Sequence, residues 1–147
     1  MTLTRIAAVM VAAVLSVGLA GCSSGSTAGA VGQVAQAPAG QPAPGRVDVA
    51  EFAAVIAQPG VQIIDVRTPE EFADGHIQGA VNIPVQQPGF AAEVAQLDPN
   101  GIYAVYCRSG NRSQPAVAEM KNAGITTVYE LAAGTKGWTA DGQPLTR

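Results

Sequence analysis

The sequence predicts an α/β domain in which helices cover both faces of a parallel β-sheet. Short runs of apolar and β-branched residues alternate along the chain with segments whose apolar residues recur at helical spacing. Turn residues such as Pro59-Gly60 separate these segments. Alternating strands and helices favour a parallel sheet buried on both faces. Residues 46–147 contain the pattern and are long enough for one such core.

Five short strands are expected in this segment. The first lies around Val47, and the others cover residues 61–66, 80–83, 102–106 and 127–131. The second and fourth are compact apolar runs of the kind found in buried strands. Pro84 ends the third strand because proline cannot donate a hydrogen bond to a neighbouring strand.

Helices are predicted over residues 49–56, from Pro69 onwards, and over residues 90–97 and 113–123. Asp48 and Glu51 have the spacing of a capping box at the start of the first. Thr68 is the expected N-cap of the second, with Pro69 in its first turn and Glu71 at N3. The last helix presents three small or apolar residues on one face and ends before Gly124; these residues are Ala116, Met120 and Ala123.

The N-terminal 21 residues are predicted to be a signal peptide. Arg5 precedes an apolar run over residues 6–19, which is short for a membrane span but typical of a signal-peptide core. The run ends in Leu19-Ala-Gly-Cys22, which resembles the lipobox of bacterial lipoproteins. That resemblance implies cleavage before Cys22, lipidation of Cys22, and anchoring in the bacterial cell envelope on the extracytoplasmic side of a membrane. An ordinary cleaved signal and an uncleaved anchor helix are the alternatives.

Residues 22–45 are expected to form a flexible tether behind the lipidated cysteine. After Cys22 the segment has no charged and no aromatic residue, so it cannot bury a core of its own. The whole chain has eight basic and eleven acidic residues, a net charge of −3, and no basic cluster. This composition argues against a nucleic-acid partner and leaves the lipid as the only membrane contact. The domain is expected to be a monomer.

Cys107 is the candidate nucleophile. If Cys22 carries lipid, Cys107 is the only thiol left, and an unpaired thiol in an exported protein is either inert and buried or kept for its chemistry. Residues 107–112 directly follow a strand and precede a helix, so backbone N–H groups and the positive end of the helix dipole can converge on the sulfur. With Arg108 and Arg112 beside it, the thiol should be shifted toward thiolate.

Three motifs in order make residues 46–147 resemble the rhodanese family. The first is Asp65-Val-Arg67 with Glu70-Glu71-Phe72 and the run Gly75-His-Ile-Gln-Gly-Ala-Val-Asn-Ile-Pro84; the second is the loop Cys107-Arg-Ser-Gly-Asn-Arg112. The third is Leu131-Ala-Ala-Gly-Thr-Lys-Gly-Trp138, in which Ala133 stands where the family usually has glycine.

The resemblance implies a rhodanese-like five-stranded parallel sheet and a two-step sulfur transfer that needs no metal or organic cofactor. The Cys107 thiolate would take the outer sulfur of a small donor such as thiosulfate, and a thiol or cyanide acceptor would remove it from the resulting persulfide. The loop residues are then the candidate substrate-binding residues: Arg108, Ser109, Gly110, Asn111 and Arg112.

Other residues near the loop are predicted to be structural. Asp65 and Arg67 are expected to pair beneath the loop, and the only histidine, His76, belongs to a turn rather than acting as a general base. Tyr106 and Trp138 are expected in the core. Lys136 lies within the third motif and is assigned no role, although its side chain is long enough to reach the mouth of the site.

Two alternative functions remain open. Phosphatases and arsenate reductases that share this fold use Cys-x5-Arg to wrap a tetrahedral oxyanion, whereas Arg112 gives Cys-x4-Arg here and Ser113 stands at the sixth position. The shorter loop suits a sulfur atom better. The second alternative is a non-catalytic module that binds a partner or holds a persulfide. Turnover of thiosulfate with an acceptor would distinguish it from an enzyme.

Overall fold

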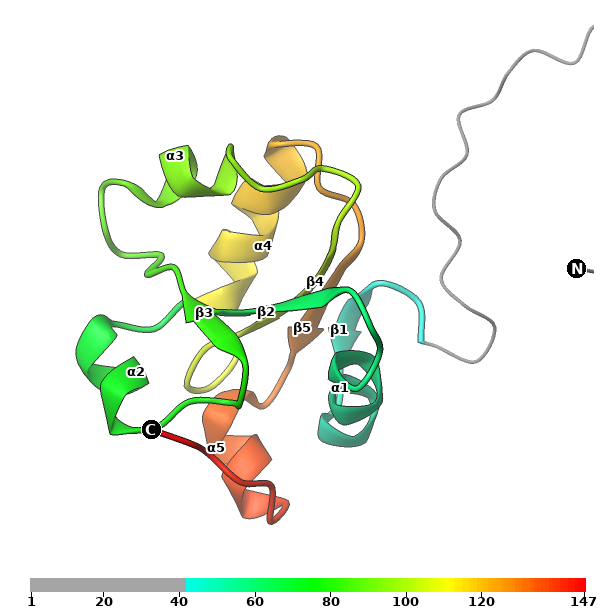
Figure 1. Cartoon of the computed structure of the whole chain (residues 1–147), viewed down its shortest axis with the longest axis vertical. Coiled ribbons are helices and arrows are strands. Elements are labelled where there is room, and N and C mark those ends of the chain that lie inside the picture. Colours follow the sequence, from blue (N-terminus) through cyan, green and yellow to red (C-terminus); the bar gives the residue numbers. More distant parts are fainter. Residues whose placement is uncertain (1–41) are drawn as a thin grey trace, which may run out of the picture. The chain divides into compact units, whose positions relative to one another are not determined.

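The chain forms a five-stranded sheet in a computed structural model that describes residues 42–147. The strands are β1 (Gly45–Val47), β2 (Val61–Asp65), β3 (Ala80–Asn82), β4 (Ile102–Tyr106) and β5 (Val128–Leu131). The helices are α1 (Val49–Ile56), α2 (Pro69–Asp74), α3 (Phe90–Val94), α4 (Ser113–Asn122) and α5 (Gly134–Ala140) (Figure 1). The predicted signal peptide, Cys22 and most of the predicted tether lie outside the described residues.

All neighbouring strands are parallel, in the order β1-β5-β4-β2-β3. This arrangement confirms the predicted α/β class and the parallel sheet. Among residues 42–147, no helix combines the length and the apolar character that crossing a membrane requires.

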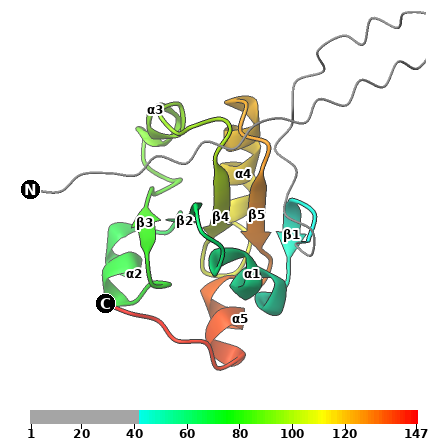
Figure 2. The ribbon, with the colours of Figure 1, turned by 45° about the vertical axis from the view of Figure 1, so that its right-hand side comes forward.

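Helices cover both faces of the sheet, as β4 shows most clearly. Tyr103 and Val105 pack in one apolar layer with α3 and α4, whereas Ala104 and Tyr106 pack in the other with α1 and α5. Successive strand side chains point to opposite faces, so a strand buried on both sides needs apolar residues throughout. Figures 1 and 2 show α3 and α4 separated from α1 and α5 by the sheet, with α2 beside its β3 edge.

Local signals set the starts of α1 and α2 as predicted. The Asp48 side chain accepts the Glu51 N–H at 2.8 Å, and the Glu51 carboxylate accepts the Asp48 N–H at 3.0 Å. Thr68 and Glu71 form the equivalent capping box at α2, with Pro69 at the first helical position. These reciprocal bonds satisfy backbone N–H groups that a helix start would otherwise leave unpaired.

Other boundaries differ from the prediction. Helix α3 ends at Val94 rather than at residue 97, because the Gln96 and Leu97 N–H groups bond to carbonyls three residues back and tighten the chain into turns. The first strand begins at Gly45, and α4 ends one residue early. Helix α5, which contains Gly134 and Gly137, was not predicted from the sequence. Glycine disfavours a helix by about 1 kcal/mol relative to alanine, so local sequence gave no helical signal there.

Candidate active site

Cys107 lies directly after β4, at the carboxyl end of a central strand of the sheet. In open parallel sheets this edge is where ligands bind. The thiol is fully buried; its sulfur accepts the Gly110 N–H at 3.2 Å and lies 3.5 Å from the Ser113 hydroxyl oxygen. The loop 107–112 therefore curls around the sulfur, and α4 begins where the loop ends.

Gly110 lets the loop make this turn. Its φ of +78° falls in the left-handed region that side-chain-bearing residues rarely adopt. A Cβ at this position would also overlap the carbonyl oxygen of Ala132 and lie 2.7 Å from a guanidinium nitrogen of Arg46. The close approach of three segments fixes the N–H that points at the sulfur.

The start of α5 holds the other side of the loop. The Thr135 and Lys136 N–H groups donate to the carbonyls of Cys107 and Arg108 at 2.9 and 3.0 Å. These N–H groups would otherwise be unpaired at the helix start, so the loop acts as the cap of α5. Gly134, at φ +58°, lies against the same loop, and a Cβ there would collide with its backbone.

Ala133 fits this arrangement although the rhodanese family usually has glycine there. Its φ of −88° and ψ of −9° are right-handed helical values that alanine adopts without strain. The positive φ falls on Gly134 instead. The departure from the family motif therefore leaves the geometry of the loop intact.

Opposing effects act on the pKa of Cys107. Burial of the thiol raises the pKa, whereas hydrogen bonds from the Ser113 hydroxyl and from the N–H groups of Ser109, Ser113 and Arg112 lower it. The net pKa lies below the ordinary value for a thiol. This is the direction expected from the sequence, although hydrogen bonds rather than the two arginines are the main cause.

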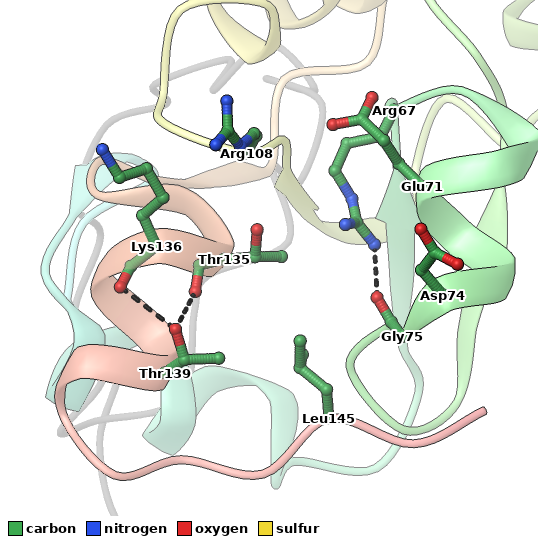
Figure 3. A pocket seen from close by; sticks show the side chains of 9 residues that line it. All are labelled: Arg67, Glu71, Asp74, Gly75, Arg108, Thr135, Lys136, Thr139 and Leu145. Atoms are coloured by element: carbon green, nitrogen blue, oxygen red, sulfur yellow. Dashed lines mark hydrogen bonds between the residues drawn. The ribbon is translucent and has the colours of Figure 1, made fainter.

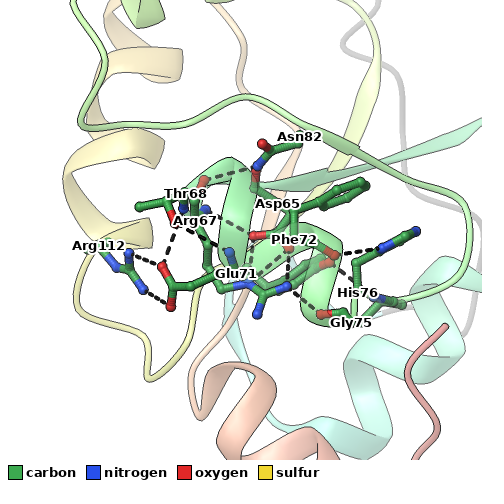
Figure 4. A network of polar contacts seen from close by, with 11 residues as sticks. Asp65, Arg67, Thr68, Glu71, Phe72, Gly75, His76, Asn82 and Arg112 are labelled. Atoms are coloured by element: carbon green, nitrogen blue, oxygen red, sulfur yellow. Dashed lines mark hydrogen bonds and ion pairs between the residues drawn. The ribbon is translucent and has the colours of Figure 1, made fainter. Parts of the chain in front are cut away.

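Arg112, the last residue of the loop, forms an ion pair with α2. Its two terminal nitrogens bond to the two carboxylate oxygens of Glu71 on α2, at 2.6 and 2.7 Å (Figure 4). This pairing lowers the pKa of Glu71 to about 2. Arg112 thus ties α2 to the loop, and its assignment as a substrate-binding residue stays a prediction.

Asp65 and Arg67 form the buried pair that the sequence predicted. The Arg67 guanidinium contacts the Asp65 carboxylate at 2.6 to 2.9 Å and donates to the Gly75 carbonyl at 2.7 Å (Figure 4). The Asn82 amide donates to the carbonyls of Asp65 and Arg67. The network joins the ends of β2 and β3 to the segment after α2.

The contacts of His76 join α2 to the C-terminal segment. The His76 backbone forms two 2.8 Å hydrogen bonds with Thr146, its Nδ1 lies 3.0 Å from the Phe72 carbonyl, and its ring stacks on Phe72. None of these contacts involves Cys107. Tyr106 and Trp138 are buried in the layer that contains α1 and α5, as predicted.

A cavity of about 300 Å³ opens beside the loop. Arg108 and Lys136 line one side of it, and Arg67, Glu71 and Asp74 line the other (Figure 3). Lys136 thus lies at this cavity beside Arg108. Ser109 and Asn111 are exposed on the loop. Within residues 42–147, no three His, Cys, Asp or Glu side chains are grouped so that they could hold a metal ion.

Two residues of the site were missed from the sequence, Glu130 on β5 and Arg46 on β1. The Ser113 hydroxyl donates to the Glu130 carboxylate at 2.7 Å, and Arg46 lies 3.4 Å from the same oxygen. Arg46 also donates to the carbonyls of Ala132 and Gly110. The sequence contained one signal for Glu130, namely a carboxylate inside the otherwise apolar strand Val128-Tyr-Glu-Leu131. All four residues of this strand are buried.

Comparison with known proteins agrees with this description. The profile of a family described as "Rhodanese-like domain" matches residues 48–141. The chain is 35% identical to thiosulfate sulfurtransferase 16, chloroplastic, of Arabidopsis thaliana, over 58% of this chain and 79% of that protein. It is also 35% identical to the senescence-associated protein DIN1 of Raphanus sativus, over 61% of this chain and only 55% of the relative.

A solved structure has the same fold. The rhodanese-related protein of Thermoplasma volcanium superposes with a TM-score of 0.61 at 28% identity, over 69% of this chain and 96% of that chain. A parallel five-stranded sheet with a cysteine loop at its carboxyl edge defines the class, and the chain belongs to the rhodanese-like domain family.

Proposed function

We propose that the domain is a sulfurtransferase that carries a sulfane sulfur on Cys107, from a small anionic donor such as thiosulfate to a thiol or cyanide acceptor. The observation that carries this proposal is the setting of the thiol, which ends a central strand, accepts a backbone N–H, and has a lowered pKa. A relative named as a thiosulfate sulfurtransferase supports the donor class.

In the first step, the Cys107 thiolate attacks the outer sulfur of thiosulfate. The thiolate electron pair forms the new S–S bond, and the pair of the broken S–S bond leaves with sulfite. Cys107 becomes a persulfide whose terminal sulfur carries the negative charge, so the total charge is unchanged. Arg108, exposed at the cavity beside the loop, is suited to hold the dianionic donor.

In the second step, the acceptor attacks the terminal sulfur of the persulfide. Cyanide leaves as thiocyanate and the Cys107 thiolate is restored. A thiol acceptor leaves as a persulfide in the same way. Because the sulfur is held covalently between two separate steps, ping-pong kinetics are expected.

The burial of Cys107 favours one alternative function, a module that holds a persulfide or binds a partner without rapid turnover. The sulfur has no exposed surface and does not line the cavity that Arg108 and Lys136 border. A donor therefore reaches it only after the loop has moved. If this movement is rare, the domain would hold a persulfide or bind a partner without rapid turnover.

A phosphatase or arsenate reductase is disfavoured because Arg112 is engaged by Glu71 and the loop is one residue shorter than the Cys-x5-Arg loop of those enzymes.

The test of the enzymatic role is thiocyanate formation from thiosulfate and cyanide at steady state. Parallel lines in double-reciprocal plots at several cyanide concentrations are expected for the two-step mechanism. A single burst of one sulfur per chain without turnover would favour the persulfide-holding module.

We also propose that the chain is a lipoprotein of the bacterial cell envelope, anchored through Cys22, with residues 1–21 removed and the domain working as a monomer. The lipobox-like sequence before Cys22 supports this proposal. Cells fed labelled palmitate should label the wild-type chain and not the Cys22→Ala variant. A wild-type chain recovered without label in a soluble fraction would contradict the anchor.

A further inference from the structure

Glu130 is a buried carboxylate that the two-step mechanism above does not use. It lies on β5, where its residue is 5% exposed, and it accepts the hydroxyl hydrogen of Ser113 at 2.7 Å. Ser113 opens α4, is fully buried, and places the same hydroxyl oxygen 3.5 Å from the Cys107 sulfur. Two hydrogen bonds therefore connect the reacting sulfur to a carboxylate through one hydroxyl group.

Cys107, Ser113 and Glu130 share a fixed number of protons, and this number restricts which hydrogen bonds they can form with one another. A serine hydroxyl has one hydrogen to donate. While Glu130 is ionised, Ser113 gives that hydrogen to the carboxylate, and the sulfur can bond to Ser113 only as a thiol that donates. Ser113 can stabilise a Cys107 thiolate only if its hydrogen turns toward the sulfur, and Glu130 must then supply a hydrogen of its own.

We propose that Ser113 and Glu130 form a proton relay for Cys107. As the sulfur becomes a thiolate, its proton passes to the Ser113 oxygen and the hydroxyl proton of Ser113 passes to Glu130. Both hydrogen bonds reverse direction, and no proton leaves for solvent. Glu130 touches neither donor nor sulfur, so it is a positioning residue that acts through Ser113. The proposal deepens the sulfurtransferase function and rests on it.

The relay balances over the reaction. A thiol and a carboxylate become a thiolate and a carboxylic acid, so the buried group keeps one negative charge throughout. The thiolate then displaces sulfite as described above while the proton stays on Glu130. When the acceptor removes the sulfur, the restored thiolate recovers the proton through Ser113. No oxidant or reductant beyond the donor and acceptor is required.

Keeping the charge constant has a physical advantage. Loss of the Cys107 proton to solvent would leave two anions near each other in a buried site, and each buried ion costs several kcal/mol. The relay avoids the second anion before a dianionic donor arrives.

The other charged and titratable groups near the relay are either paired with each other, neutral, or cationic, so none of them can accept the proton of Cys107. Asp65 pairs with Arg67, and Glu71 pairs with Arg112, so these four charges offset one another. Burial raises the pKa of Tyr106 and Tyr129, so both remain neutral. The remaining cations are Arg46 on β1, which is 3.4 Å from Glu130, and Arg108 and Lys136 at the cavity.

The test is the pH profile of Cys107 alkylation by iodoacetamide in the full chain, followed by mass analysis of the peptide that contains Cys107. Glu130→Gln keeps an oxygen that can accept from Ser113 but cannot take a proton. Because the relay releases no proton to solvent, the thiolate that it forms should give the wild type a pH-independent component of alkylation at pH values below the pKa of the thiol. Glu130→Gln should lose this component, so that alkylation there slows about tenfold. Glu93→Gln, which makes the same change on the exposed face of α3, should leave the profile unchanged.

A purely electrostatic or structural role predicts other results. Removing a nearby negative charge would lower the apparent pKa of Cys107 and so speed alkylation at low pH, and a role limited to packing would leave the profile unchanged. Either result overturns the relay. Because alkylation requires no sulfur donor, a wild-type chain that fails to accept sulfur from thiosulfate refutes the proposed function without changing the outcome of this test.

Ser113→Ala provides a second route if Glu130→Gln does not fold. It should also lose the pH-independent alkylation, and Glu130→Gln added to it should have no further effect there, because the connection is already broken. An unchanged profile in Ser113→Ala, or an independent effect of Glu130→Gln in that background, overturns the relay.

Discussion

On the α2 side of the Cys107 loop two carboxylates, Asp65 and Glu71, are each matched with an arginine, whereas on the β5 side Glu130 is bonded to a hydroxyl that contacts the sulfur. Asp65 and Glu71 contact Arg67 and Arg112 at 2.6 Å, with both members of each pair held in one geometry. Glu130 lies 3.4 Å from Arg46, whose side chain is 42% exposed. The same chemical group is therefore closely paired with arginine on one side and bonded to a hydroxyl beside the sulfur on the other.

This difference separates the carboxylates that stabilise the loop from the carboxylate that is connected to the reacting sulfur through Ser113. A carboxylate that is tightly paired with arginine has a low pKa, as Glu71 does at about 2, and cannot accept a proton near neutral pH. Such pairs fix the position of the loop. Substitutions on the α2 side and at the Cys107 loop should therefore have separable effects on stability and on sulfur transfer.

Cys107→Ser should abolish sulfur transfer to below detection, because a serine hydroxyl is a far weaker nucleophile toward sulfur. The variant should fold normally, since it exchanges one small buried group for another. Thiocyanate formation measures the loss, with His76→Asn as the control. The His76 ring contacts Phe72 rather than the loop, so its replacement should retain most activity. A loss as large as that of Cys107→Ser would promote His76 to a catalytic residue.

Asp65→Asn should lower the free energy of unfolding by about 3–5 kcal/mol, because it leaves the Arg67 cation buried without its counter-charge. Urea denaturation of the full chain measures the change. Glu93→Gln on α3 serves as the exposed control and should stay within about 0.5 kcal/mol of the wild type. If Asp65→Asn cost no more than this control, the pair would not support the loop.

Gly134→Ala should destabilise the fold by about 1–3 kcal/mol and also reduce sulfur transfer, since a Cβ at φ +58° would displace the backbone of the Cys107 loop. Ala133→Gly is the matched control at the neighbouring residue. Its right-handed backbone has no need of glycine, so it should cost less than about 1 kcal/mol. Equal effects at the two positions would show that loop contact does not distinguish them.

Glu71→Gln should have the smallest effect, about 1 kcal/mol at neutral pH, because the Glu71–Arg112 pair is partly exposed and screened. The pKa of Glu71 is lowered in the fold from 4.5 to about 2. Its contribution is therefore complete above about pH 4.5 and is lost as the pH falls toward 2. Urea denaturation of the wild type and the variant at several pH values should show the two curves converging in that range. A difference that persists below pH 2 would refute the ion-pair explanation.

The sequence predicted those parts of the fold and site that depend on neighbouring residues. The capping boxes of α1 and α2, the apolar runs of β2 and β4, and the Asp65–Arg67 pair all involve groups a few positions apart. The loop beginning at Cys107 was recognised because its strand, glycine and helix are contiguous.

The features that sequence reasoning missed depend on distant contacts. Helix α5 has two glycines and is held at its start by carbonyls of the Cys107 loop, so no local propensity indicated it. Arg112 meets Glu71 from 41 positions away, and Ser113 meets Glu130 from 17. Only the order of strands in the sheet brings β5 beside β4, and with it Glu130 beneath the loop.

The central claim is that Cys107 carries the sulfur. Its most direct test is the mass of the Cys107 peptide after the full chain has been incubated with thiosulfate and freed of excess donor. The account predicts an added mass of one sulfur atom on that peptide, which cyanide removes with release of one thiocyanate per chain. A peptide of unchanged mass under conditions in which the chain remains folded would contradict the account.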